Sequence, residues 1–115
     1  MSQYLVLIYG NEAWWAGASP EDRAQLTKEH SEFAERNSSV IIGGNALHPT
    51  STATSIRPQA DGGHTVTDGA FAETKEALGG YYLVEAADLD QAVAIAQQVP
   101  TRLGGLEVRP VWDVM

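Results

Sequence analysis

The chain has no cysteine, no cluster of basic residues and no long hydrophobic run, and each absence excludes a class of protein. Without cysteine it cannot form a disulfide, use a thiolate nucleophile or bind zinc through sulfur. Its formal net charge is −8. Binding to nucleic acid without sequence preference, and binding to anionic membranes, both require clustered Lys and Arg. The longest apolar run at the N-terminus, Tyr4 to Tyr9, is too short to cross a bilayer. We therefore expect a cytoplasmic protein with neither a nucleic-acid nor a membrane partner.

Length and composition predict a single soluble domain. The 115 residues fall within the usual range for one domain, which we place over residues 1–115. The apolar share of 43% and the charged share of 19% are ordinary for a globular protein. No repeat, low-complexity tract or interdomain linker interrupts the chain.

Two helices are expected, each with a capping signal. Ser19 and Pro20 suit the cap and first position of a helix that runs to about Asn37. Asp88 caps the second helix with Gln91 as its reciprocal partner, and Pro100 stops it. The predicted inward stripe of the first helix is Leu26, His30, Phe33 and Ala34. That of the second is Leu89, Ala92, Val93, Ala96 and Val99.

Six further segments are predicted to be strands. The continuous apolar run from Leu5 to Tyr9 predicts a central strand covered on both faces, followed by a loop from Asn11 to Ala18. A strand beginning at Val40 is expected to carry a bulge or close backbone approach at its adjacent glycines. The remaining strands are expected at Thr52 to Arg57, at His64 to Thr67 across the Asp61-Gly62-Gly63 turn, at Tyr81 to Val84 and at Gly105 to Trp112.

This order of elements predicts an α+β fold. Two β-α-β halves around a small hairpin insert imply a ferredoxin-like split β-α-β sheet with both helices on one face. The opposite face would then be bare, and a chain of this size cannot leave a wide apolar face in water. We therefore expect a symmetric homodimer that packs sheet on sheet, with Trp14, Trp15 or Trp112 near the interface.

The segment from Val66 to Tyr82 carries a recognisable signature. It contains Asp68-Gly69-Ala70-Phe71, then Glu73-Thr74-Lys75-Glu76, and reaches a strand through Gly79-Gly80-Tyr81-Tyr82. The chain thereby resembles the YCII-related proteins of the DGPF type, small bacterial domains named for an Asp-Gly-Pro-Phe tetrapeptide. Ala70 stands where that motif has proline, and the tetrapeptide is expected to form a tight turn that buries Phe71. The likeness extends to Tyr4 through Gly10, Gly43 through Pro49, Ser51 through Thr54 and Glu107 through Pro110, and so covers nearly the whole chain.

The resemblance implies a dimeric α+β barrel but no agreed activity. Members of the family carry a helix histidine at the place of His30, and they are proposed to hold a His–Asp pair. Through the tetrapeptide, the aspartate of that pair corresponds to Asp68. Members are also frequently encoded beside extracytoplasmic-function sigma factors, which implies an accessory or regulatory role as the alternative to catalysis.

Two residues are candidates for acid–base chemistry on their own properties. His30 lies in an apolar helix stripe, where it is either a satisfied core residue or a general acid/base, because imidazole titrates near neutral pH. Asp68 precedes glycine, a preferred turn pair. Its carboxylate either serves that turn alone or orients His30 as a third group orients a catalytic base.

Other side chains are candidates for ligand contact. Three cations are candidates to bind an anionic group of a ligand: Arg57, Lys75 and Arg109. The alternative is that they are solvated surface charges. Tyr9 lies at the end of a strand and is a candidate ligand contact as well as a packing residue. No metal site and no cofactor are expected, because no two of the three histidines are spaced to share a helix face and no phosphate-loop spacing occurs.

The sequence therefore predicts a protein that binds a small organic molecule in a cleft between helix and sheet. A proton-transfer or hydrolytic step through His30 and Asp68 is one form of this function. A non-enzymatic binding or regulatory module is the other, and a scaffold without a ligand is a third.

Overall fold

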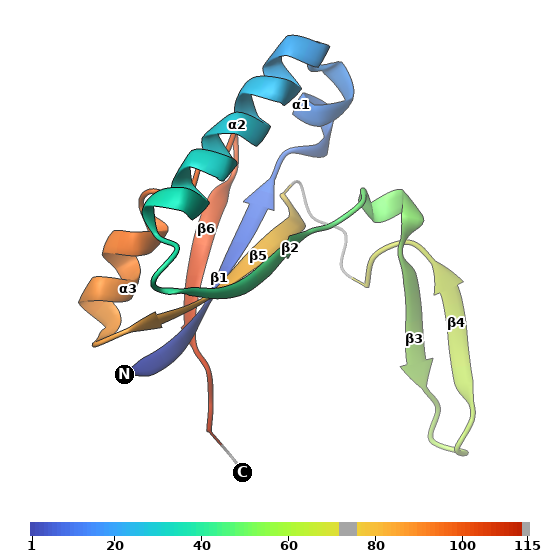
Figure 1. Ribbon diagram of the computed structural model, residues 1–115. Coiled ribbons are helices and arrows are strands. Elements are labelled where there is room, and N and C mark those ends of the chain that lie inside the picture. Colours follow the sequence, from blue (N-terminus) through green and yellow to red (C-terminus); the bar gives the residue numbers. More distant parts are fainter. Residues whose placement is uncertain (72–75, 114–115) are drawn as a thin grey trace.

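The fold is built on a four-stranded antiparallel sheet (Figure 1). The structure is a computed structural model, and it describes residues 1–71 and 76–113. The strands are β1 (Ser2–Gly10), β2 (Ile41–Ala46), β5 (Ala77–Ala86) and β6 (Gly105–Pro110), in the order β2-β5-β1-β6. This order, with two crossover helices, is the predicted ferredoxin-like α+β arrangement.

The two long helices begin where their capping residues predict. Helix α2 (Pro20–Arg36) has Ser19 as its N-cap, whose hydroxyl accepts from the backbone N–H of Asp22 at 3.1 Å. Helix α3 (Leu89–Ala96) has Asp88 as its N-cap, whose carboxylate accepts from the Gln91 N–H at 2.9 Å. Within residues 1–71 and 76–113, no helix is long and apolar enough to span a membrane.

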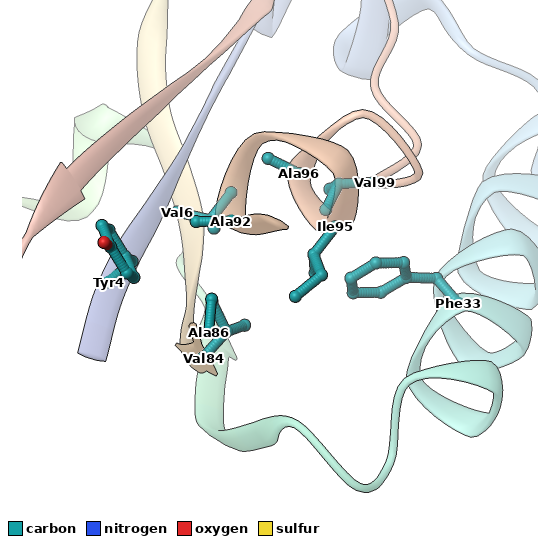
Figure 2. Packing of buried hydrophobic residues seen from close by; sticks show 9 residues of the cluster. All are labelled: Tyr4, Val6, Phe33, Val84, Ala86, Ala92, Ile95, Ala96 and Val99. Carbon is teal, nitrogen blue, oxygen red and sulfur yellow. The ribbon is translucent and has the colours of Figure 1, made fainter. Parts of the chain in front are cut away.

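Both helices pack on the same face of the sheet. Phe33 of α2 and Ile95 of α3 point toward each other above the sheet (Figure 2). They close on Val6 and Val84, which are fully buried on the two central strands. The rest of the core is Tyr4, Ala86, Ala92, Ala96 and Val99. Because side chains alternate along a strand, Leu5 and Leu7 lie on the opposite face, which the described chain leaves uncovered. The expectation that β1 is covered on both faces is thus met on one face only.

One predicted loop is a helix. Residues Glu12–Gly17 form α1, a short helix that follows β1 directly. Asn11 caps it by accepting from the Trp14 N–H at 3.2 Å, a capping signal that the loop prediction overlooked. The two tryptophans meet edge to face, with ring centroids 5.6 Å apart.

The predicted inward face of α3 was partly wrong. Leu89 and Val93 are 50% and 37% exposed, whereas Ile95, which the prediction omitted, is 6% exposed. The helix ends at Ala96, so its buried stripe is Ala92, Ile95 and Ala96, and Val99 is buried from the turn that follows. The prediction applied helical spacing as far as Val99, which lies beyond the end of the helix.

The glycine-containing edge strand behaves as predicted. The register of β2 against β5 shifts between Ile41 and Gly43, which marks a bulge. A Cβ on Gly44 would lie 2.6 Å from the carbonyl oxygen of Tyr81, so glycine permits a close backbone approach there.

The hairpin insert forms a second, separate sheet. After the short 3-10 helix η1 (Thr50–Thr52), β3 (Thr54–Pro58) pairs antiparallel with β4 (His64–Asp68), and the pair projects from the body of the molecule (Figure 1). The connecting turn is the expected one, because Gly62 has φ +94°.

The motif phenylalanine lies outside the core. Phe71 was expected to be buried, but it is 62% exposed, and the guanidinium of Arg57 lies 4.0 Å from its ring centroid. Phe71 follows the hairpin rather than the main sheet, so no core surface is available to it. The glycine of the tetrapeptide, Gly69, does adopt a positive φ of +103°.

The two phenylalanines of the chain make a matched stability test. Phe33→Ala should lower the free energy of unfolding by about 3–5 kcal/mol, because a fully buried ring is lost from the centre of the core. Phe71→Ala should cost less than about 1 kcal/mol, the value of an exposed cation–π contact. Urea unfolding of both variants measures the difference. Equal losses would contradict the assignment of the core.

Candidate functional site

A cavity of about 330 Å³ lies between the helices and the sheet. Leu26, Thr27 and His30 of α2 form one wall, and Trp15 of α1 contributes to its rim. The β2 and β5 segments 44–46 and 79–82 form the floor with Ile8, and residues 100–102 close the remaining side. The volume falls in the range of small-molecule sites in proteins.

His30 and Tyr82 form the polar pair of this cavity. Nδ1 of His30 lies 2.9 Å from the Tyr82 hydroxyl oxygen, and the two rings stack with centroids 6.0 Å apart. Leu26 and Phe33, on the same stripe of α2, are both buried, so helical spacing directs His30 toward the sheet. Tyr82 is two residues from the buried Val84 and therefore faces the helices.

Burial keeps both members of the pair uncharged near neutral pH. Burial lowers the pKa of His30 below its ordinary value, although a hydrogen bond to the Pro100 backbone and the charge of Glu29 act in the opposite direction. Burial also raises the pKa of Tyr82. The site therefore presents a neutral imidazole beside a protonated phenol.

The surrounding backbone favours one arrangement of protons. Proline has no N–H, so the Pro100 backbone can only accept a hydrogen bond. A neutral ring has a single N–H, and if that proton serves Pro100, Nδ1 accepts the proton of the Tyr82 hydroxyl. This leaves His30 as a base in contact with a phenol donor.

An ion pair closes the cavity beside His30. Arg102, in the segment between α3 and β6, donates from one guanidinium nitrogen to both carboxylate oxygens of Glu29, at 2.7 and 2.8 Å. The hydrogen bond from Arg102 holds the pKa of Glu29 below its usual range. The charge of Arg102 is thus balanced by a carboxylate of α2 and is not free to bind an anion.

Two contacts fix α1 at the rim. Glu12 accepts from the backbone N–H and the hydroxyl of Thr50, at 2.7 and 2.5 Å, which lowers the pKa of Glu12. Arg23 of α2 donates from two nitrogens to the carbonyl oxygen of Trp15, at 2.5 and 3.1 Å. Trp15 is therefore held at the cavity from two directions.

The other predicted site residues lie elsewhere in the chain. Asp68 ends β4, opposite Thr54, and does not line the cavity; the groups that shift the pKa of His30 do not include it. Arg57 contacts Phe71. Arg109 pairs with Glu107 at 2.5 Å on β6.

Two remaining candidates have different outcomes. Tyr9 is not a lining residue, and its backbone oxygen accepts from the Thr101 hydroxyl at 3.4 Å. Lys75 lies outside the described residues.

Sequence reasoning did not single out Tyr82 as a site residue and missed the pair of Glu29 and Arg102. The available signal for Tyr82 was its place two residues before Val84, on the side of β5 that faces the helices. No spacing rule joins Glu29 to Arg102, because they are 73 residues apart. Among the described residues, no group of three His, Asp or Glu side chains is arranged to hold a metal ion.

Comparison with known proteins identifies a domain family that spans almost the whole chain. The family model of the YCII-related domain matches residues 2–115. An uncharacterized protein of Rhizobium meliloti (strain 1021) is 35% identical over 113 residues, which cover 94% of this chain and 90% of that protein. The family match extends over the sheet, the helices and the hairpin.

The lowered pKa of His30 predicts a specific loss of stability in mild acid. The unfolded chain takes up a proton near the ordinary value of 6.5, but the folded chain resists it, so stability is complete above that pH and falls below it. The slope should stay under about 1.4 kcal/mol per pH unit, the limit for one proton. His30→Gln should flatten this slope between pH 6.5 and 5.

Urea unfolding of both proteins across that range makes the measurement. Glu12 and Glu29 have lowered pKa values and an ordinary value of 4.5, so their own losses begin only at more acidic pH. Identical slopes in the two proteins would mean that His30 titrates alike in the folded and unfolded states.

Proposed function

We propose that the chain, which belongs to the YCII-related family, binds a small, neutral and largely apolar molecule in the cavity between α2 and the sheet. The observation that carries this proposal is a cavity with mainly apolar or backbone walls and a partly buried polar pair, His30 and Tyr82. The other hydrogen-bonded polar pair among its lining residues, Asn45 and Tyr81, is exposed. Such sites use apolar surface for affinity and a few polar groups for orientation.

The charge of the site supports a neutral ligand. Among the described lining residues, Arg102 is the one permanent cation, and it is engaged by Glu29. His30 stays neutral because it is buried. An anion would enter without a free partner, into a chain whose net charge is already −8, and would lose its hydration without compensation.

An acid–base step is the catalytic form of this proposal. In it, Nδ1 of His30 accepts a proton from the bound molecule in place of the Tyr82 hydroxyl, and Tyr82 is the neighbouring donor. A dyad with Asp68 would require that carboxylate to arrive from a second chain, because the described contacts of His30 do not include it. A protein that binds the molecule equally well without His30 would be a binding module instead.

The proposed assembly is a homodimer through the open face of the sheet. Leu5 lies directly opposite Leu83, and Leu7 opposite Tyr81, so four large side chains share that face. Glu107 and Arg109 pair with each other beside them on β6. An apolar centre with a polar edge is the usual anatomy of a subunit interface.

A matched pair of ligands tests the cavity. Naphthol, a neutral aromatic, should bind and quench Trp15 fluorescence, whereas naphthoate, of similar shape but charged, should bind about tenfold or more weakly because its charge finds no free cation. Fluorescence titration of both compounds measures the two affinities. Tighter binding of naphthoate would contradict the proposed neutral ligand.

Replacing either of two alanines by phenylalanine tests whether naphthol binds in this cavity. Ala46→Phe places a large ring at a lining position of β2 and should abolish binding of naphthol. Ala24→Phe adds the same ring to an exposed, non-lining position of α2 and should leave it unchanged. Equal affinity in both variants would place the compound outside this cavity.

Introducing one charged residue tests whether the open face of the sheet is the dimer interface. Leu83→Glu should convert a dimer into a monomer at low micromolar concentration, since it would bury a carboxylate in the centre of the interface. Val93→Glu, on the solvent side of α3, is the control and should remain dimeric. Light scattering gives both masses. A monomeric wild type would refute the assembly.

A further inference from the structure

We infer that the β3–β4 hairpin is an arm that packs its apolar face against a second copy of this chain. The inference builds on the proposed dimer but concerns a different surface. This arm comprises residues 54–68. Its role is to hold the two copies together outside the sheet-to-sheet contact.

The arm exposes apolar side chains on one of its faces. Ile56 and Val66 are direct cross-strand partners and are 56% and 62% exposed. Arg57 and Thr65, the next pair, lie on the other face, where Arg57 covers Phe71. Nine of the ten strand residues are exposed, and an isolated two-stranded hairpin is at best marginally stable in water. The arm therefore needs a surface to pack on.

The shape of the chain shows that it does not supply this surface itself. The radius of gyration is 16.2 Å, whereas a compact domain of this length would have about 13 Å. The principal extents are 48 × 44 × 18 Å, so the molecule is a thin slab with the arm projecting from one side (Figure 1). The arm extends beyond the sheet rather than folding back over it.

Three observations favour a second copy as the occupant. The chain has two uncovered apolar surfaces, the open sheet face and the apolar face of the arm. We infer that one two-fold dimer covers both surfaces. The chain is only 18 Å thick in its shortest dimension, and we infer that in a stacked dimer the projecting arm reaches the other copy. The family model also matches the arm together with the sheet, so the arm belongs to the domain and is not an appended module.

Charge restricts where two such copies can touch. Each chain carries −8, so copies repel one another at long range. Ile56 and Val66 form an uncharged centre on the arm, as Leu5 and Leu83 do on the open face. Asp68 shares the face of Val66, so the arm would also bring this carboxylate to the second copy.

The absence of cysteine provides a direct test. Val66→Cys creates a single thiol on the apolar face of the arm, and Thr65→Cys creates one on the opposite face as the control. In the dimer, a neutral maleimide should react with the thiol at position 66 on the order of tenfold more slowly than with that at position 65, because the partner must open first. Dilution to monomer should remove the difference.

Each outcome has a separate meaning when the mass is measured on the same samples. A dimer with equally reactive thiols overturns the arm and leaves the sheet-to-sheet dimer intact. A monomer at every concentration overturns both. Protection that persists in the diluted monomer means that the arm packs on its own chain, which also overturns the inference. Ile56→Cys, the cross-strand partner, repeats the test if the first variant does not fold.

Discussion

Packing of both helices on one face of the sheet is the constraint on which the rest of this structure depends. Phe33 and Ile95 meet above the sheet, and Val6 and Val84 lie beneath them. The space left between α2 and the sheet, beyond the reach of α3, is the cavity. The opposite face of the same strands has no cover within the described chain. One asymmetry therefore produces both the proposed ligand site and the need for a second copy.

The chemistry of the cavity depends on the surroundings of its partly buried polar pair, His30 and Tyr82. Burial pushes the pKa of His30 down and that of Tyr82 up, so the pair is neutral near physiological pH. The neighbouring cation, Arg102, is held by Glu29 and serves to join α2 to the segment before β6. A close approach at Gly44 brings the edge strand against β5 at the floor. The result is a site suited to orienting a neutral molecule and to accepting one proton.

Local signals predicted much of the fold, and distant contacts limited the prediction of the site. Ser19 and Asp88 predict the starts of their helices, because an N-cap side chain bonds a backbone N–H only three residues further on. The alternation and turn chemistry of the hairpin are equally local. The placement of the hairpin away from the core has no local signal in the sequence. For this reason Phe71 was expected in the core, and Asp68 beside His30. The partners of His30 come from residues 52 and 70 positions away, beyond any spacing rule. Short helix α1 was missed although Asn11 carried its capping signal.

The central claim is that the sheet separates two functions, with a ligand on its helix face and self-association on its open face. Methyl NMR of one leucine- and isoleucine-labelled sample tests this division directly. Naphthol should shift the methyl signals of Ile8 and Leu26, which line the cavity, and leave Leu5 and Leu83 in place. Dilution through the dimer–monomer transition should do the reverse. If both treatments move the same methyl groups, the two faces do not act separately and the account is wrong.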